Sequence, residues 1–218
     1  MLSCFSGYFN IIQQTKQVNI MKRKGVFKAN NVLILNGATR INGNTDLILK
    51  TIIESSENTE VKINQINLRK KKIADCIGCF QCHDDDKCSI KDDMKEIREE
   101  INKSDLLIFA SPVYWWGVTG VMKIFIDRLY FYYSSINKKL IKGKKAIIVS
   151  PMNMNSDIHK LKIFIKFYDI LFDNLDIELV DSYFFGNINK KGEIATNSEY
   201  LRKVECLGKN LIEYFNRT

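Results

Sequence analysis

Short apolar runs alternate with amphipathic stretches along most of this chain. The runs at residues 32–35 and 106–110 are apolar throughout, which is typical of parallel strands buried on both faces. The run at 61–68 instead alternates apolar and polar residues, which predicts a half-exposed strand at a sheet edge. Two further runs, at 146–149 and 177–185, complete a set of five predicted strands.

Apolar positions at three- and four-residue spacing predict helices after the strands. Asp92 and Asp93 precede one such pattern, and acidic residues are favoured at a helix N-terminus. Strands that alternate with helices imply an α/β fold, with a doubly wound parallel sheet covered on both faces. The apolar helical positions are Leu49, Ile52 and Ile53; Met94, Ile97 and Ile101; Val118, Val121, Met122, Phe125, Ile126 and Leu129; those within residues 157–172; and, in a closing helix, Leu201, Val204, Leu211 and Phe215.

The length and composition are those of one globular domain. A chain of 218 residues can bury one sizeable core, and no linker divides it. We therefore expect a single domain at residues 31–218, preceded by an N-terminal extension at 1–30 that shows no clean period. The apolar content of 45% and the charged content of 27% are ordinary for a folded protein and argue against disorder.

No apolar run reaches the roughly 18 residues of a membrane-spanning helix, so no membrane partner is predicted. The apolar patch at residues 5–12 is interrupted by polar residues and has no basic residue before it, which is unlike a secretory signal. We expect a cytoplasmic protein. In such a reducing compartment, clustered thiols are more often metal ligands or redox groups than a disulfide framework. Cys4 and Cys206, far from the other cysteines, look like ordinary small residues.

The formal net charge of +8 comes from scattered basic residues and one tight cluster at residues 69–72. A solvated loop is one interpretation of this cluster, and attraction of an anionic cofactor or acidic partner is another. No nucleic-acid-binding motif accompanies the charge, so we expect no nucleic-acid partner.

Four of the six cysteines fall in one loop, at residues 76–88. The spacing C-x2-C-x2-C-x5-C suits a [4Fe-4S] cluster held by one compact loop, and Gly78 adds backbone freedom between the first two thiols. Zinc fits less well, since its sites usually join two separated pairs of ligands. An empty or redox-active loop is the remaining alternative. The candidate metal ligands are Cys76, Cys79, Cys82 and Cys88.

Two other loops follow predicted strands. The loop at residues 36–45 joins a strand to a helix, where backbone N–H groups and the helix dipole favour a phosphate, although a simple capping turn would use the same residue types. It has neither a Walker sequence nor a dinucleotide fingerprint, so a mononucleotide phosphate fits best. The loop at 111–117 carries aromatic rings and free amides that suit a flat ring system, or that pack at a subunit interface. A weaker third contact is expected at 150–153.

These loops resemble the flavodoxin-like NAD(P)H-dependent FMN reductase family. The family motif Gly-Ser-x-Arg-x-x-Gly-Asn-Thr is matched by Gly37, Arg40, Gly43, Asn44 and Thr45, with Ala38 in place of the serine. The segment from Ser111 to Gly120 is similar to the family's Ser-Pro-Val-Tyr segment, and Lys123 and Asp127-Arg128 follow it as in the family. The cysteine spacing resembles that of the iron–sulfur flavoprotein subgroup.

The resemblance implies a five-stranded sheet of order 2-1-3-4-5, bound FMN, an NAD(P)H or ferredoxin-like electron donor, and a homo-dimer or tetramer. FMN would carry the chemistry, so no catalytic side chain is expected. The cysteine loop is expected on the same rim of the sheet as the flavin. The alternative function is a flavodoxin-like regulatory module with a zinc-binding or redox-sensing loop. The implied cofactor-binding residues are Thr39, Arg40, Asn44, Thr45, Pro112, Val113, Tyr114, Trp115, Trp116, Gly117 and Ser150.

Overall fold

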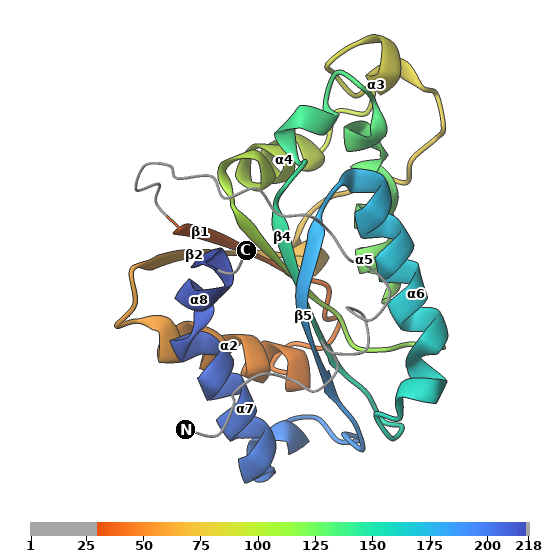
Figure 1. The fold of residues 1–218 in the computed structure, drawn as a ribbon. Coiled ribbons are helices and arrows are strands. Elements are labelled where there is room, and N and C mark those ends of the chain that lie inside the picture. The colour runs from red at the N-terminus through yellow and green to blue at the C-terminus, as the bar shows by residue number, and fades with distance from the viewer. Residues whose placement is uncertain (1–29, 217–218) are drawn as a thin grey trace.

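A computed structural model describes residues 30–216 of the chain. Five strands form one sheet in the order β2-β1-β3-β4-β5, and every neighbouring pair is parallel (Figure 1). The five predicted strands and their order are thus confirmed. The strands are β1 (Asn30–Asn36), β2 (Val61–Asn67), β3 (Leu106–Ala110), β4 (Lys145–Pro151) and β5 (Glu178–Phe185).

Helices cover both faces of the sheet, as predicted. α2, α7 and α8 pack on one face, while α4, α5 and α6 pack on the other (Figure 1). The α-helices are α2 (Asn44–Ser56), α3 (Gln81–Asp84), α4 (Met94–Lys103), α5 (Gly120–Arg128), α6 (Ile158–Leu175), α7 (Ser198–Lys209) and α8 (Leu211–Asn216). The short 3₁₀ helices are η1 (Leu68–Lys70), η2 (Leu129–Tyr133), η3 (Lys138–Leu140) and η4 (Glu193–Thr196).

The central strands feed both cores because successive side chains of a strand point to opposite faces. In β3, Leu107 and Phe109 belong to the core under α4, α5 and α6, while Leu106 and Ile108 belong to the core under α2 and α7. All five residues of β3 are buried, which explains its uniformly apolar sequence. β2 pairs only with β1 and alternates in exposure, so the prediction of an edge strand is confirmed.

Three local features differ from the sequence prediction. The closing helix is two helices, α7 and α8, separated at Asn210, whose side-chain amide donates to the Cys206 carbonyl and so competes with the helical hydrogen bonds. The apolar stripe of α5 continues from Leu129 as the 3₁₀ helix η2. The cysteine loop contains the four-residue helix α3, which no periodicity predicted.

No helix within residues 30–216 combines the length and the apolar character needed to cross a bilayer. The predicted N-terminal extension and Cys4 lie outside the described residues. The division of the chain into an extension and one domain therefore stays a prediction.

Close contact between α2 and α7 depends on Gly208. A Cβ atom placed there would lie 2.5 Å from the Ile52 carbonyl oxygen and 2.8 Å from Ser55 Cβ. We expect Gly208→Ala to push the two helices apart and to lower the free energy of unfolding by about 1–3 kcal/mol, measured by urea titration. Gly120→Ala is the control, because a Cβ there meets nothing within 4 Å. Equal stability of the two variants would contradict this account of the α2–α7 contact.

Candidate functional site

A pocket of about 630 Å³ opens at the carboxyl edge of the sheet. The loops that follow β1, β3, β4 and β5 form it, because the ends of parallel strands meet at one edge. It lies where β1 and β3 pair directly, the point at which the strand order reverses. The residues that line it are Ala38, Thr39, Arg40, Gly43, Asn44, Thr45, Pro112, Val113, Tyr114, Trp115, Trp116, Pro151, Met152, Asn153, Met154, Ile188, Asn189 and Lys191.

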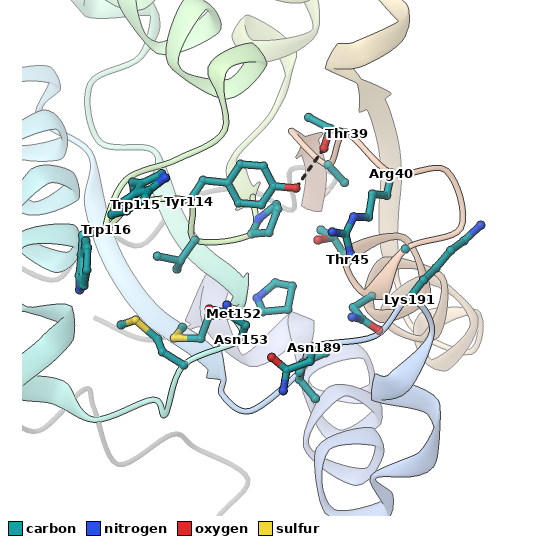
Figure 2. A pocket seen from close by; sticks show the side chains of 18 residues that line it. Thr39, Arg40, Thr45, Tyr114, Trp115, Trp116, Met152, Asn153, Asn189 and Lys191 are labelled. Carbon is teal, nitrogen blue, oxygen red and sulfur yellow. Dashed lines mark hydrogen bonds between the residues drawn. The ribbon is translucent and has the colours of Figure 1, made fainter.

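The pocket has two chemically different ends. Figure 2 shows Trp115 and Trp116 at one end and Arg40 and Lys191 at the other. Thr45 and Asn189 add polar groups at the cationic end. An elongated ligand with a flat apolar part and an anionic part would find a matching surface at each end.

The cationic end is built on the N-terminus of α2. Gly43 is the N-cap, with extended backbone angles and no side chain to bond the first turn. The first intrahelical bond runs from the Leu47 N–H to the Gly43 carbonyl (3.1 Å), so the N–H groups of residues 44–46 have no acceptor inside the helix. These N–H groups and the positive end of the helix dipole make the end of the pocket suitable for an anion.

A partly buried hydrogen-bond network holds the loop before α2. Asn36, which is fully buried, donates to Asp46 (2.7 Å) and accepts from the Ala38 N–H (2.9 Å). Asp46 also accepts from the Asn42 N–H (2.8 Å) and pairs with Arg69 (3.1 Å), whose guanidinium reaches the Ala38 carbonyl as well. Two interpretations of the basic cluster at 69–72 are a solvated loop and a site that attracts an anionic ligand. Arg69 fits neither interpretation, because its guanidinium is bound to Asp46 and to the Ala38 carbonyl. It fastens the loop.

The charge state of Asp46 reflects this network. Burial alone would raise the pKa of Asp46, but the hydrogen bonds from Arg69 and Asn36, the charge of Arg69 and the Asn42 N–H outweigh burial and leave the pKa below its usual value of 3.8. Asp46 is thus ionised throughout the neutral range, and its negative charge is matched by Arg69.

The aromatic end is built on a tight hairpin. Tyr114 and Gly117 exchange two backbone hydrogen bonds of 2.9 Å each, with the two tryptophans between them. Trp115 and Trp116 have φ angles of 47° and 56°, in the left-handed region that bulky residues rarely adopt. Such conformations cost of order 1–3 kcal/mol each and are concentrated at functional sites. Trp115 is 91% exposed, so packing in this chain does not account for its position.

Direct contacts join the two loops. The Thr119 hydroxyl donates to the Gly37 carbonyl (2.6 Å) and Thr119 is also the N-cap of α5. A Cβ atom at Gly37 would lie 2.8 Å from Met122 Cβ, so a larger residue would separate β1 from α5. Across the pocket, the Thr39 and Tyr114 hydroxyls lie 3.3 Å apart (Figure 2). The two ends of the pocket are therefore held in one fixed relation.

Most of the predicted cofactor-binding residues come together around this pocket, but three need comment. Gly117 does not line it, because its backbone is used in the hairpin. Ser150 does not line it either; it is fully buried in β4, and its hydroxyl has no hydrogen-bond partner among the described residues. Asn44 does line it, yet its amide donates to the Lys190 carbonyl (2.8 Å) and accepts from the Ile194 N–H (3.1 Å). Asn44 thereby anchors the loop after β5.

That loop was not predicted to contribute. Ile188, Asn189 and Lys191 line the pocket, although no local motif distinguishes them. The sequence signal that could have found them is topological: β5 is parallel to β4, so the loop after it must reach the same edge. Pro151, Met152 and Asn153 line the pocket where the weaker third contact was expected, while Ala38, Gly43 and Met154 were not predicted.

The cysteine loop lies elsewhere, and its expected place on the rim of the pocket is wrong. No residue of 76–88 lines the pocket. The loop contacts the far end of α5 and the segment after it, since Asn137 donates to the Cys82 carbonyl (3.2 Å) and His83 stacks on Tyr130 with ring centroids 4.9 Å apart. Figure 1 shows α3 at the end of the molecule where α6 ends, away from the loops after β4 and β5. The extended segment before α3 carries the chain there.

The donor set of this loop fits an iron–sulfur cluster. All four cysteines are free thiols, and Gly78 has a φ of 63° with open space around it, so the loop can adjust. Burial, followed by the charges of Cys88, Cys76 and Cys79, raises the pKa of Cys82, so the other three thiols lie near it. Within residues 30–216, however, no three Cys, His, Asp or Glu side chains already converge as metal ligands. Electrostatic coupling extends further than a coordination bond, which reconciles the two observations.

The sequence of this chain matches the model of a known protein family. The model of a family described as NADPH-dependent FMN reductase matches residues 30–167 of this chain. The match includes the loops after β1, β3 and β4 and the cysteine loop, but not the loop after β5 that carries Lys191.

Curated relatives point to a subgroup. An "Iron-sulfur flavoprotein" of Archaeoglobus fulgidus is 36% identical over 108 residues, which are 50% of this chain and 48% of the relative. An iron–sulfur flavoprotein of Clostridioides difficile (strain 630) is 38% identical over 122 residues, which are 55% of this chain and 52% of the relative. The chain spans about half the length of these curated relatives.

A solved structure shares the fold. The NAD(P)H:quinone oxidoreductase from Methanothermobacter marburgensis has a TM-score of 0.64 and 16% sequence identity, and the alignment covers 84% of this chain and 96% of that one. At this identity the likeness concerns the flavodoxin-like fold alone.

The lowered pKa of Asp46 predicts a pH-dependent contribution to stability. A carboxylate whose pKa is depressed by folding stabilises the native state above its unfolded pKa, here about 3.8, and that contribution is lost as the pH falls through the lower folded pKa. We expect Asp46→Asn to lower the free energy of unfolding by about 1.5–3 kcal/mol at pH 7, because it removes charged hydrogen bonds. In urea titrations, the difference from the wild type should shrink below pH 3.8. A difference that is constant down to pH 2.5 would contradict an ionised Asp46 in the network.

Proposed function

The chain belongs to the NADPH-dependent FMN reductase family, and on this premise we propose that it is an FMN-binding redox protein of the iron–sulfur flavoprotein type. The observation that carries the proposal is the pocket with two unlike ends, Arg40 and the α2 N-terminus at one and the strained Tyr114–Gly117 hairpin at the other. FMN has the corresponding chemistry, a phosphate joined to a flat ring by a polar chain.

The residues present fit FMN end by end. Arg40, Thr39, Thr45 and the first-turn N–H groups of α2 would hold the phosphate. Pro112, Val113, Tyr114, Trp115 and Trp116 would bind the ring, with the backbone of Gly117 holding the hairpin in place. Asn44 would act by anchoring the loop after β5, and Ser150 by completing β4 beneath the site. Ala38 stands in place of the family's serine and has no hydroxyl, so Thr39 would supply the phosphate contact that the serine hydroxyl would otherwise make.

When bound, FMN supplies hydride and electron transfer. The protein contributes binding, orientation and exclusion of water, so we assign no catalytic side chain. Family membership favours a nicotinamide donor. A ferredoxin-like donor is the second candidate, because the relatives are named iron–sulfur flavoproteins. We place the protein in the cytoplasm, because four clustered free thiols are typical of metal or redox sites in a reducing compartment.

We assign a [4Fe-4S] cluster to Cys76, Cys79, Cys82 and Cys88. Four free thiols at this spacing suit such a cluster. Zinc is less favoured, because its sites usually join two separated pairs of ligands and these four cysteines lie in one short loop. Because the loop lies at the far end of α5 from the pocket of the same chain, we propose that it exchanges electrons with the FMN of a second copy whose pocket faces the loop. Such an arrangement would be a homo-dimer or tetramer, and the exposed Trp115 would then gain a contact.

The proposal predicts a coloured protein. After purification without oxygen, we expect flavin absorption at about 370 and 450 nm together with a broad iron–sulfur shoulder that dithionite bleaches. Metal analysis should give about four iron atoms per chain. A colourless protein that neither contains iron nor binds added FMN would overturn the proposal, and zinc in place of iron would favour the regulatory alternative.

The control separates the two cofactors. Cys79→Ser should lose iron and keep FMN, since Cys79 is remote from the pocket. Loss of FMN together with iron would show that the two sites depend on each other.

The phosphate assignment predicts selectivity for FMN over riboflavin. Both tryptophans of the chain line the pocket, so quenching of their fluorescence reports ligand binding directly. We expect Arg40→Ala to weaken FMN binding by about tenfold, since it removes one charged contact to the phosphate, and to leave riboflavin binding unchanged. Lys50→Ala is the control, because it removes a positive charge from an exposed position of α2, away from the pocket. An equal loss of affinity for FMN and riboflavin would show that Arg40 does not bind the phosphate.

A further inference from the structure

Arg128, the last residue of α5, is a buried cation beside the cysteine loop. Its side chain is 1% exposed. One guanidinium nitrogen donates to Asp92 (2.6 Å) and to the Ala74 carbonyl (2.8 Å). The other donates to Asp92 (3.2 Å) and to Cys88 Sγ (3.5 Å). A charge this deeply buried is retained only where specific partners satisfy it.

These contacts join the two ends of the loop. Ala74 lies two residues before Cys76, and Asp92 lies four residues after Cys88. Asp92 also accepts from the backbone N–H groups of Ala74 (3.0 Å) and Met94 (3.1 Å). Arg128 and Asp92 therefore close the loop at its base, and they hold Cys88 against the core of the protein.

The loop is held unevenly. Cys82 and Cys88 are half-buried and pack on the core, and the backbone of Cys82 is bound by the buried Asn137. Cys76 and Cys79 are exposed. Of the four sulfurs, Cys88 is the one to which a buried cation donates a hydrogen bond. Such an environment changes the electronic properties of a metal ligand as well as its position.

We propose that Arg128 is a positioning residue that fixes Cys88 as a cluster ligand and, through its N–H to the sulfur, raises the reduction potential of the cluster. The proposal rests on the proposed function, in which Cys88 is a ligand. A hydrogen bond and a positive charge at a thiolate withdraw electron density from it, and so favour the state that holds the added electron.

The nearby acidic residues act in the opposite direction. Asp84, Asp85 and Asp86 would lower the potential, but they are exposed, and solvent and salt screen their charges. Asp92 is the acid that matters, because its side chain is only 9% exposed and in direct contact with Arg128. It neutralises much of the arginine's charge, and what remains for Cys88 is chiefly the hydrogen bond.

The test compares two substitutions whose effects on the potential differ in sign. Arg128→Gln removes the charge and the N–H to Cys88, so the potential should fall. Asp92→Asn leaves the charge of Arg128 uncompensated, so the potential should rise. Each variant is purified without oxygen, its iron content is measured, and the cluster is titrated against redox mediators by EPR. At a fixed potential near the midpoint we expect about a tenfold lower ratio of reduced to oxidised cluster in Arg128→Gln, equal to about 59 mV for one electron.

Two further variants separate tuning from loop stability. Asn137→Ala loosens the loop at the Cys82 backbone without touching a sulfur, so it should lower iron content and leave the potential unchanged. Arg128→Lys keeps the charge without the forked geometry, and should retain the cluster with a potential below that of the wild type. Where Arg128→Gln also retains the cluster, the potential of the lysine variant should lie between those of the glutamine variant and the wild type.

The outcomes are distinguishable. Opposite shifts in Arg128→Gln and Asp92→Asn support the proposal. A loaded cluster with an unchanged potential in both Arg128 variants overturns it and leaves the proposed function intact. Loss of iron from both Arg128 variants and from Asn137→Ala alike shows a structural role only, and also overturns the tuning. A wild-type protein that binds FMN but never assembles a cluster overturns the ligand assignment itself.

Discussion

The direct pairing of β1 with β3 is the constraint on which the site depends. The chain leaves β1 toward α2 on one face of the sheet and leaves β3 toward α5 on the other, so the two loops diverge at the point where the strands adjoin. The pocket opens between these two loops, at the ends of β1 and β3. Gly37 lets the loops approach, and the Thr119–Gly37 hydrogen bond fixes their separation. The loops after β1 and β3, which carry Arg40, Trp115 and Trp116, take their positions from this junction.

Two carboxylate–arginine pairs then fasten the loops that strand pairing leaves free. Asp46 with Arg69 holds the loop after β1, and Asp92 with Arg128 closes the cysteine loop. In both, the carboxylate also accepts backbone N–H groups, so the pair fixes main-chain geometry as well as charge. Desolvation offsets much of the energy of a buried ion pair. The contribution of these pairs is therefore conformational: each permits one arrangement of its loop.

The sequence was informative where a residue type has one local meaning. Apolar runs identified the strands, and Thr39, Arg40 and Thr45 were found because a strand–loop–helix junction places them at a sheet edge. Lys191 carries no such signal, since only the packing of β5 brings its loop to the pocket. The cysteine loop was misplaced for a related reason. The strand order predicts where β2 ends but not where the chain goes next. Ten extended residues can span at most about 33–36 Å, which exceeds the length of a seven-residue strand such as β1. Asn44 and Arg69 were of the right type for a ligand, but hydrogen bonds to other parts of the chain occupy them.

Charge in this protein acts locally and not through its total. The net charge of +8 suggests a general attraction for anions, yet the two arginines in the pairs above are neutralised by their own carboxylates. What reaches the pocket is the field of Arg40 and Lys191, both exposed and therefore screened by salt over about 8–10 Å. The N–H groups at the start of α2 are oriented by the helix and need no net charge to bind an anion. Under the proposed function, selection of a phosphate at this end of the pocket consequently depends more on the geometry that Asp46 and Arg69 impose than on the excess of basic residues in the chain.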